Sequence, residues 1–198
     1  MILIGQYDSP FVRRVAIALR RYDLAYEHRP WSVWGDAELI AQLNPLRRVP
    51  VLVMDDGVAL VESAAILDAL DDLVGPERAL LPRSGPRRRE GLRVCSLATG
   101  IGDKAVVLLY EHVLRTEERR SGVWVDRCRA QIRDTLALLE SDRRQRPTTF
   151  WLGDQLTHPD VAVACVLRFL AEAHPGLSLS DCPALAAHAE RCEALPEF

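Results

Sequence analysis

Residues 49–63, VPVLVMDDGVALVES, contain the pattern that most narrows the folds open to this chain. Two short runs rich in β-branched residues flank the pair Asp56-Gly57, a strong signal for a tight β-hairpin. From Ser63 onward the apolar residues recur at helical spacing until Gly75, a residue type that commonly ends helices. The segment therefore predicts two antiparallel strands followed directly by a helix.

The residues before this hairpin predict a strand, a helix and a second strand. Residues 2–4 form a short apolar run, and residues 10–21 carry apolar side chains at helical spacing behind a serine-proline pair. Residues 25–30 are a weaker strand candidate because their alternation is poor. The order β-α-β, then a longer connection, then β-β-α predicts an α/β domain over residues 1–76.

Strand signals disappear in the second half of the chain, which predicts a separate all-helical domain. Residues 77–89 are rich in proline, glycine and arginine and are typical of a linker, so the helical domain is expected over residues 90–198. Helical patterns occupy residues 90–115, 123–144, 158–173 and 183–194. Residues 160–171 are apolar on nearly every side, which places them at the centre of a helical bundle.

Composition excludes several classes of function. The formal net charge of −3 does not favour binding to nucleic acid. No apolar run approaches the roughly 20 residues that span a bilayer, and no signal-peptide pattern is visible, so we expect no membrane association. The five cysteines are widely spaced without a C-x-x-C pair, which favours a reduced, cytoplasmic protein with no metal site.

Four stretches carry a family resemblance, in matching order along almost the whole chain. They are SPFVRRV (9–15), NPLRRVPVL (44–52), LVESAAILDAL (60–70) and LGDQLTHPDVAVACVL (152–167). On these residues the chain resembles the cytosolic glutathione S-transferases of the serine-type, bacterial-like branch. The resemblance implies a thioredoxin-like N-terminal domain, an all-helical C-terminal domain and a homodimer. Two residues depart from the family pattern, since Arg47 replaces its usual glycine and Ala69 its usual tyrosine.

The resemblance implies that glutathione is the co-substrate and that its thiol reacts as a thiolate with a small hydrophobic electrophile. A thiol pKa near 8.5 must fall by ~2 units, which corresponds to about 2.7 kcal/mol. A helix N-terminus supplies roughly 0.3–2 kcal/mol, and one hydrogen bond to a charged acceptor about 1.5–3 kcal/mol. Ser9 would donate that bond, with Tyr7 as the alternative donor. Ser9 before Pro10 is also typical of a simple helix cap, and that interpretation stays open.

The same resemblance implies which residues hold glutathione: Phe11, Arg48, Val49, Pro50, Glu62 and Ser63. Arg48 would meet the glycyl carboxylate, although the neighbouring Arg47 could do so instead. Val49 would offer its backbone to the cysteinyl group in front of a cis Pro50. Glu62 would pair with the γ-glutamyl amine, and the hydroxyl and helix N-terminus at Ser63 would bind the γ-glutamyl carboxylate.

The sequence gives less information about the electrophile, the second substrate, than about glutathione. Four side chains are candidates for the wall of an electrophile pocket: Trp34, Ile101, Val107 and Tyr110. Each could equally belong to the hydrophobic core. Other glutathione-dependent reactions (disulfide or peroxide reduction, dehalogenation, isomerisation) would use the same site. A non-enzymatic interaction protein resembling stringent starvation protein is a further alternative, but such proteins often lose the glutathione contacts that are present here.

Overall fold

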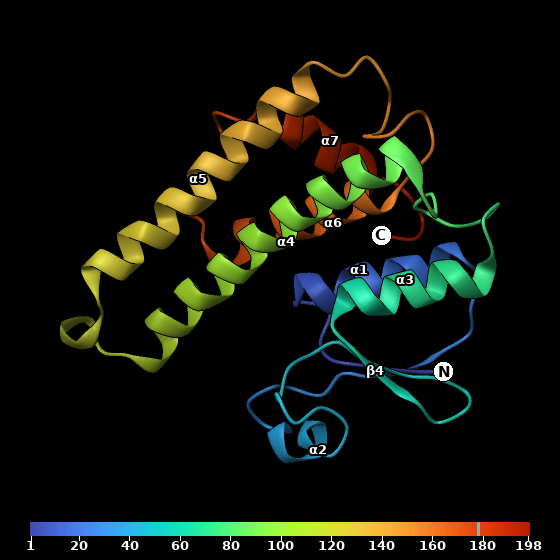
Figure 1. The fold of residues 1–198 in the computed structure, drawn as a ribbon. Coiled ribbons are helices and arrows are strands. Elements are labelled where there is room, and N and C mark those ends of the chain that lie inside the picture. Colours follow the sequence, from blue (N-terminus) through green and yellow to red (C-terminus); the bar gives the residue numbers. More distant parts are fainter. Residues whose placement is uncertain (178) are drawn as a thin grey trace. The chain divides into compact units, whose positions relative to one another are not determined.

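The computed structural model describes residues 1–177 and 179–198. The chain divides into two compact units (Figure 1). The first consists of Met1–Arg83 together with Pro196–Phe198, and the second of Ser84–Leu195. The first contains the sheet and the second is helical, so the predicted α/β plus all-α fold class is confirmed.

The first unit is a four-stranded mixed sheet with helices on both sides. Its elements are β1 (Ile2–Ile4), α1 (Pro10–Arg21), β2 (Glu27–Arg29), α2 (Ala37–Ala41), β3 (Val51–Val53), β4 (Ala59–Val61) and α3 (Ser63–Val74). The strand order is β2-β1-β3-β4, with β2 parallel to β1 and the other pairs antiparallel. Figure 1 shows α1 and α3 side by side over one face and α2 on the other. This is the predicted thioredoxin-like arrangement.

Alternating strand residues divide the core of this unit into two layers. Leu3 and Leu52 face α1 and α3 and lie in one buried cluster with Val15 and Ile66. The neighbouring residues in the strands point to the opposite face, where Ile40 of α2 is fully buried. The period-2 pattern of β1 and β3 therefore accounts for helices on both faces.

Helix α2 is an element that the sequence did not indicate. It has only five residues, too few for an apolar period to be visible, and its cap residue Asp36 makes no side-chain cap bond. Burial of Ile40 against the sheet holds it in place. The expected strand at 25–30 is also shorter than predicted and includes only Glu27–Arg29.

The second unit is built around a buried central helix. Its elements are α4 (Gly85–Leu114), a 3-10 turn η1 (Glu117–Arg119), α5 (Gly122–Arg144), α6 (His158–Ala173) and α7 (Pro183–Glu193). Twelve of the sixteen residues of α6 are buried, which confirms the predicted centre of the bundle. Among the described residues, no helix is both long and apolar enough to span a membrane.

The start of α6 depends on one buried carboxylate. Asp160 is fully buried and accepts hydrogen bonds from the backbone N–H of Trp151 at 2.7 Å and of Thr157 at 2.8 Å. The Thr157 hydroxyl donates to the same carboxylate. Thr157 and Asp160 thus form a capping box, which also fastens the preceding loop to the helix.

The boundary between the units differs from the expected linker at 77–89. Helix α4 begins at Gly85, so the arginine-rich residues 87–89 are helical. Pro86 lies in the first turn of α4, where its missing N–H leaves no hydrogen bond unmade. Pro86, which the sequence analysis included in the linker, therefore lies inside the first turn of the helix.

The last three residues also depart from the expected division, since they pack with the first unit rather than with residues 90–195. The Arg13 guanidinium donates to the carbonyl of Phe198 at 3.2 Å and lies 5.6 Å from the centre of its ring. Arg21 pairs with the carboxylate of Glu197 at 3.3 Å. These contacts fasten the end of the chain to α1.

Candidate functional site

The sheet register brings three chain segments to one end of the sheet. Ile4, which ends β1, pairs with Val51, which begins β3, and Val51 pairs with Val61, which ends β4. The residues that leave β1, enter β3 and leave β4 therefore emerge next to one another. These segments are residues 5–9, 48–50 and 62–63. They contain Ser9 and most of the predicted glutathione contacts.

Ser9 is the cap of α1, and its hydroxyl oxygen accepts from the backbone N–H of Val12 at 3.4 Å. The side chain is half-buried. A hydroxyl has two lone pairs and one hydrogen, so accepting this long bond leaves the hydrogen free to donate. The cap and a donor role are therefore compatible at Ser9.

The hydroxyl and the ring of Tyr7 both contact other residues of the first unit. Its hydroxyl lies 3.0 Å from the hydroxyl of Tyr26, and its ring stacks on His28 with 3.9 Å between ring centres. Burial and the hydrogen bond with Tyr26 raise the pKa of Tyr7 to about 12. Because its hydroxyl already has a partner, Tyr7 is less available than Ser9 to donate to a thiolate.

Val49 presents an unpaired peptide group at the entry to β3. The Val49–Pro50 peptide bond is cis. Among the described residues, neither the N–H nor the C=O of Val49 takes part in a hydrogen bond. A half-buried peptide group of this kind can pair with the backbone of an extended peptide ligand.

Gly5 positions this end of the sheet and was missed by the sequence analysis. Its φ is +124°, and a Cβ placed on it would lie 2.5 Å from Cγ2 of Val12 and 2.8 Å from Cβ of Val49. The missing side chain thus allows α1 and the Val49 segment to approach each other. The available signal was a glycine directly after an apolar strand.

Gly5→Ala is expected to lower the free energy of unfolding by about 2–5 kcal/mol, because the new methyl group meets backbone strain and overpacking together. Urea unfolding followed by circular dichroism measures this change. Gly57→Ala is the matched control, since Gly57 also has a positive φ of +86° but nothing within 4 Å of an added Cβ. Equal losses in the two variants would show that the close approach contributes nothing.

Asn44 holds the loop that leads to Val49. It is buried, its side-chain amide donates to the carbonyl of Arg48 at 2.9 Å, and its oxygen accepts from the N–H of Leu46 at 3.1 Å. The asparagine stands in the NPLRRVPVL stretch, but sequence reasoning gave it no role. It is a positioning residue for Arg48.

The two neighbouring arginines of this loop point to different partners. Arg47, with φ of +52°, pairs with Glu38 at 3.0 Å. Arg48 lies 3.6 Å from the carboxylate of Glu62, and both side chains are about half exposed. The structure therefore brings Arg48, and not Arg47, next to a second predicted glutathione contact.

The start of α3 combines a carboxylate with unpaired backbone donors. Glu62 caps the helix with φ of +68°, a conformation that non-glycine residues seldom adopt and that is enriched at functional sites. The first helical hydrogen bond runs from the N–H of Ile66 to the carbonyl of Glu62. The N–H groups of residues 63–65 therefore have no partner inside the helix, and Ser63 is buried beside them. Such a helix start is suited to an anion.

The remaining predicted residues are spread over both units. Phe11 is half-buried in the first turn of α1, and Trp34 is 55% exposed in the loop between β2 and α2. Ile101 is buried in the core of the helical unit. Val107 and Tyr110 are half-buried on α4. The assignment of these side chains to the wall of an electrophile pocket stays a prediction. Ile101 lies in the hydrophobic core of the helical unit.

The cysteine side chains of this protein are poor candidates for a reactive thiol. All five are free and buried. Burial raises the pKa of the thiols of Cys128, Cys182 and Cys192. Among the described residues, no three side chains of the His, Cys, Asp and Glu types are grouped to hold a metal ion. A reactive thiol at this site would have to come from a ligand.

Comparison with known proteins identifies the family. Residues 3–78 match the model described as glutathione S-transferase, N-terminal domain, and residues 122–191 match that of the C-terminal domain. The uncharacterized GST-like protein YibF of Escherichia coli (strain K12) is 30% identical over 173 residues, which cover 86% of this chain and 82% of that relative. The chain belongs to the glutathione S-transferase family. The identification as a glutathione transferase made from the sequence is confirmed.

Solved glutathione S-transferases share the fold over the whole chain. The enzyme of Methylobacterium radiotolerans, solved with glutathione sulfonate, is 33% identical with a TM-score of 0.92, covering 100% of this chain and 92% of that one. A glutathione transferase family member of Pseudomonas fluorescens Pf-5, solved with glutathione, is 32% identical with a TM-score of 0.85. The match covers 99% of this chain and 95% of that one. Assignment of this glutathione transferase to the serine-type branch stays a prediction.

Proposed function

We propose that this glutathione transferase binds glutathione at the end of the sheet defined above and transfers it to small hydrophobic electrophiles. The observation that carries the proposal is the strand register, which gathers the Ser9 cap, the unpaired Val49 peptide group and the start of α3 at one end of the sheet. The ligands present in the solved relatives are consistent with it.

In the proposed complex each part of the peptide meets a matching group. The Val49 backbone pairs with the cysteinyl unit, while the helix start at Ser63 takes the γ-glutamyl carboxylate. Glu62 binds the γ-glutamyl amine, and Arg48 the glycyl carboxylate. These contacts place the sulfur at the first turn of α1.

Ser9 then stabilises the thiolate by donating its hydroxyl hydrogen. The thiol proton passes to solvent, so no general base is required. With an activated aryl halide, the sulfur lone pair forms a new C–S bond and the halide leaves with the C–halogen bonding pair. The side chain of Ser9 remains unmodified throughout.

We further propose a cytoplasmic homodimer that acts in detoxification. Membership in the family and the absence of a spanning helix among the described residues are consistent with this. Reduction, dehalogenation or isomerisation with glutathione would use the same thiolate, and an electrophile screen distinguishes them.

Calorimetric titration with reduced glutathione tests the proposed site. The wild type is expected to bind, and Glu62→Gln is expected to weaken binding by about tenfold because a charge-assisted hydrogen bond is lost. Glu38→Gln is the matched control, since this exposed carboxylate pairs with Arg47 outside the proposed site. Lack of binding by the wild type, or equal weakening by both substitutions, would refute the proposal.

A further inference from the structure

Residues 5–9, which connect β1 to α1 and end at Ser9, are held by the neighbouring edge strand β2. The Nε2 atom of His28 in β2 lies 2.8 Å from the carbonyl oxygen of Gly5. A carbonyl oxygen only accepts, so Nε2 carries the hydrogen and donates it. The N–H of Gly5 donates to the carbonyl of Arg29 at 2.9 Å. Both backbone groups of Gly5 are therefore fixed to β2.

The ring of Tyr7 lies flat against the ring of His28. The two ring centres are 3.9 Å apart, and the ring planes are inclined by only 5°. The Tyr7 hydroxyl lies 3.0 Å from that of Tyr26, and the Arg20 guanidinium lies 5.5 Å from the centre of the Tyr7 ring. Tyr26 and His28 are two residues apart, so on extended backbone their side chains lie on the same side. Tyr7 is therefore held through both its ring and its hydroxyl.

These contacts bear directly on the position of Ser9. The N–H of Ser9 donates to the carbonyl of Gln6 at 3.2 Å, which closes a four-residue turn over residues 6–9. Tyr7 and Asp8 are the two central residues of this turn. Because the Tyr7 ring is fixed against β2, the turn is fixed as well, and with it the direction in which the Ser9 side chain leaves the backbone.

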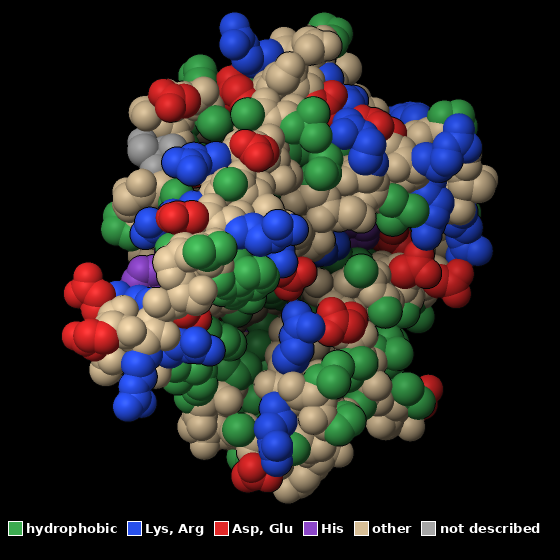
Figure 2. Space-filling model, turned by 60° about the vertical axis from the view of Figure 1, so that its left-hand side comes forward, with side chains coloured by type: hydrophobic (Ala, Val, Ile, Leu, Met, Phe, Trp, Pro, Cys, Tyr) green, Lys and Arg blue, Asp and Glu red, His purple; other side chains and the backbone are tan. Residues whose placement is uncertain are grey.

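The proposed thiolate depends on short-range contacts. The formal net charge of the chain is −3, and Figure 2 shows acidic and basic side chains interspersed over the face that it presents. Salt screens the field of exposed charges over about 10 Å. A hydrogen bond forms only at about 2.5–3.2 Å and weakens steeply when it is bent. A small displacement of Ser9 therefore removes much of its effect on the sulfur.

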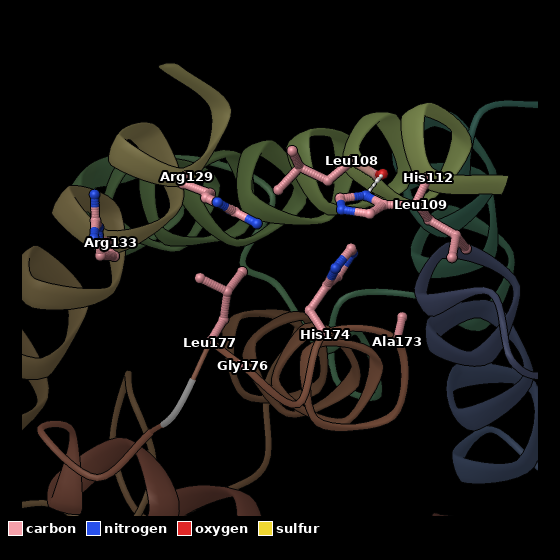
Figure 3. Close-up of a pocket in the computed structure, with 9 residues that line it drawn as sticks. All are labelled: Leu108, Leu109, His112, Arg129, Arg133, Ala173, His174, Gly176 and Leu177. Carbon is pink, nitrogen blue, oxygen red and sulfur yellow. Dashed lines mark hydrogen bonds between the residues drawn. The ribbon is translucent and has the colours of Figure 1, made fainter. Parts of the chain in front are cut away.

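We propose that Tyr7 and His28 are positioning residues for Ser9, because their stacked rings hold the turn of residues 6–9 with the Ser9 hydroxyl directed at the glutathione sulfur. This inference rests on the proposed function, in which Ser9 donates to the thiolate. It gives Tyr7 a role through its ring rather than through its hydroxyl. The pocket drawn in Figure 3 lies in the helical unit, and none of these residues lines it.

Two substitutions that remove the stack, Tyr7→Leu and His28→Gln, test the inference through the pH profile of kcat/KM with glutathione and an activated aryl halide. In the wild type the inflection is expected near pH 6.5. Each variant is expected to raise it by about one unit, so that kcat/KM falls by about five- to tenfold at pH 6 and approaches the wild-type value above about pH 8.5. A merely structural loss would lower the rate by the same factor at every pH.

Tyr26→Phe is the matched control, because it removes the hydroxyl contact of Tyr7 and leaves both stacked rings in place. It is expected to leave the inflection within about 0.3 units of the wild-type value. Tyr7→Phe restores the ring and is expected to return the inflection to that value. Agreement between Tyr7→Leu and His28→Gln excludes titration of the imidazole as the cause, since Tyr7→Leu retains His28.

Combination with Ser9→Ala shows whether the stack acts through Ser9. In that background Tyr7→Leu is expected to change kcat/KM by less than about twofold, because the donor is already absent. An undiminished effect there would overturn the inference. So would a wild-type inflection near pH 6.5 that neither Tyr7→Leu nor His28→Gln moves, and that result would leave the proposed function intact. A wild type without glutathione-dependent activity would refute both.

Discussion

Replacing Ser9 with alanine is expected to lower kcat/KM for the conjugation of glutathione with an activated aryl halide by about 10–100-fold at neutral pH. The loss corresponds to one hydrogen bond donated to a charged sulfur, about 1.5–3 kcal/mol. Because the Ser9 hydroxyl accepts only a long bond from Val12, the substitution removes little helix stability by comparison. Steady-state kinetics on the purified protein measure the effect.

The pH dependence of the same reaction separates the thiolate role from a structural one. In the wild type the rate is expected to rise with pH through a thiol pKa near 6.5, about 2 units below the free value. In Ser9→Ala the inflection moves upward toward about 8.5. The difference between the two proteins therefore shrinks as the pH rises and free thiol ionises in both. A fixed ratio at all pH values would contradict the thiolate role.

Two further variants serve as controls for Ser9. Ser9→Thr keeps a hydroxyl at the same position and is expected to retain more activity than Ser9→Ala. Tyr7→Phe removes the competing hydroxyl, which already has Tyr26 as a partner, and is expected to leave kcat/KM within about threefold of wild type. Loss of activity in Tyr7→Phe with retention in Ser9→Ala would assign the donor to Tyr7.

Asp160→Ala is expected to lower the free energy of unfolding by about 3–5 kcal/mol, the largest effect on stability among these predictions. The substitution leaves the buried N–H of Trp151 and the N–H of Thr157 without an acceptor and removes the carboxylate half of the capping box of α6. Since α6 is the centre of the helical core, its loosening affects the whole unit. Urea unfolding monitored by circular dichroism reports the change.

Asp154→Ala provides the matched control for the capping box. The Asp154 carboxylate accepts from the N–H of Thr149 at 3.1 Å in the loop before α6, but it is exposed. Its loss is expected to cost less than about 1 kcal/mol because water replaces the exposed partner. If Asp160→Ala were no more destabilising than Asp154→Ala, the capping box would not hold α6 in place.

Local signals predicted the long elements well. The apolar period and the serine cap of residues 10–21 correspond to α1, and the pattern beginning at Ser63 corresponds to α3. Helix propensity, capping and periodicity act within a few turns, so they can be seen in the sequence. Pro86 shows the limit, because a proline is compatible both with a linker and with the first turn of a helix.

The candidate site was only partly predictable. Ser9, Arg48 and Glu62 were named through the family resemblance, residue by residue. The choice of Arg48 over Arg47 required the observation that Arg47 pairs with Glu38. The role of Gly5 depends on its distance to Val49, a residue far away in the sequence.

The sequence by itself determined the two-part division into α/β and helical halves, the hairpin at Asp56-Gly57 and the buried character of α6, because hydrophobic periodicity and turn chemistry are local. Only the tertiary structure decided which residues meet at one end of the sheet and which tyrosine hydroxyl already has a hydrogen-bond partner. These properties depend on contacts between residues distant in the chain, and those contacts are set by strand register and helix packing, which local patterns do not encode.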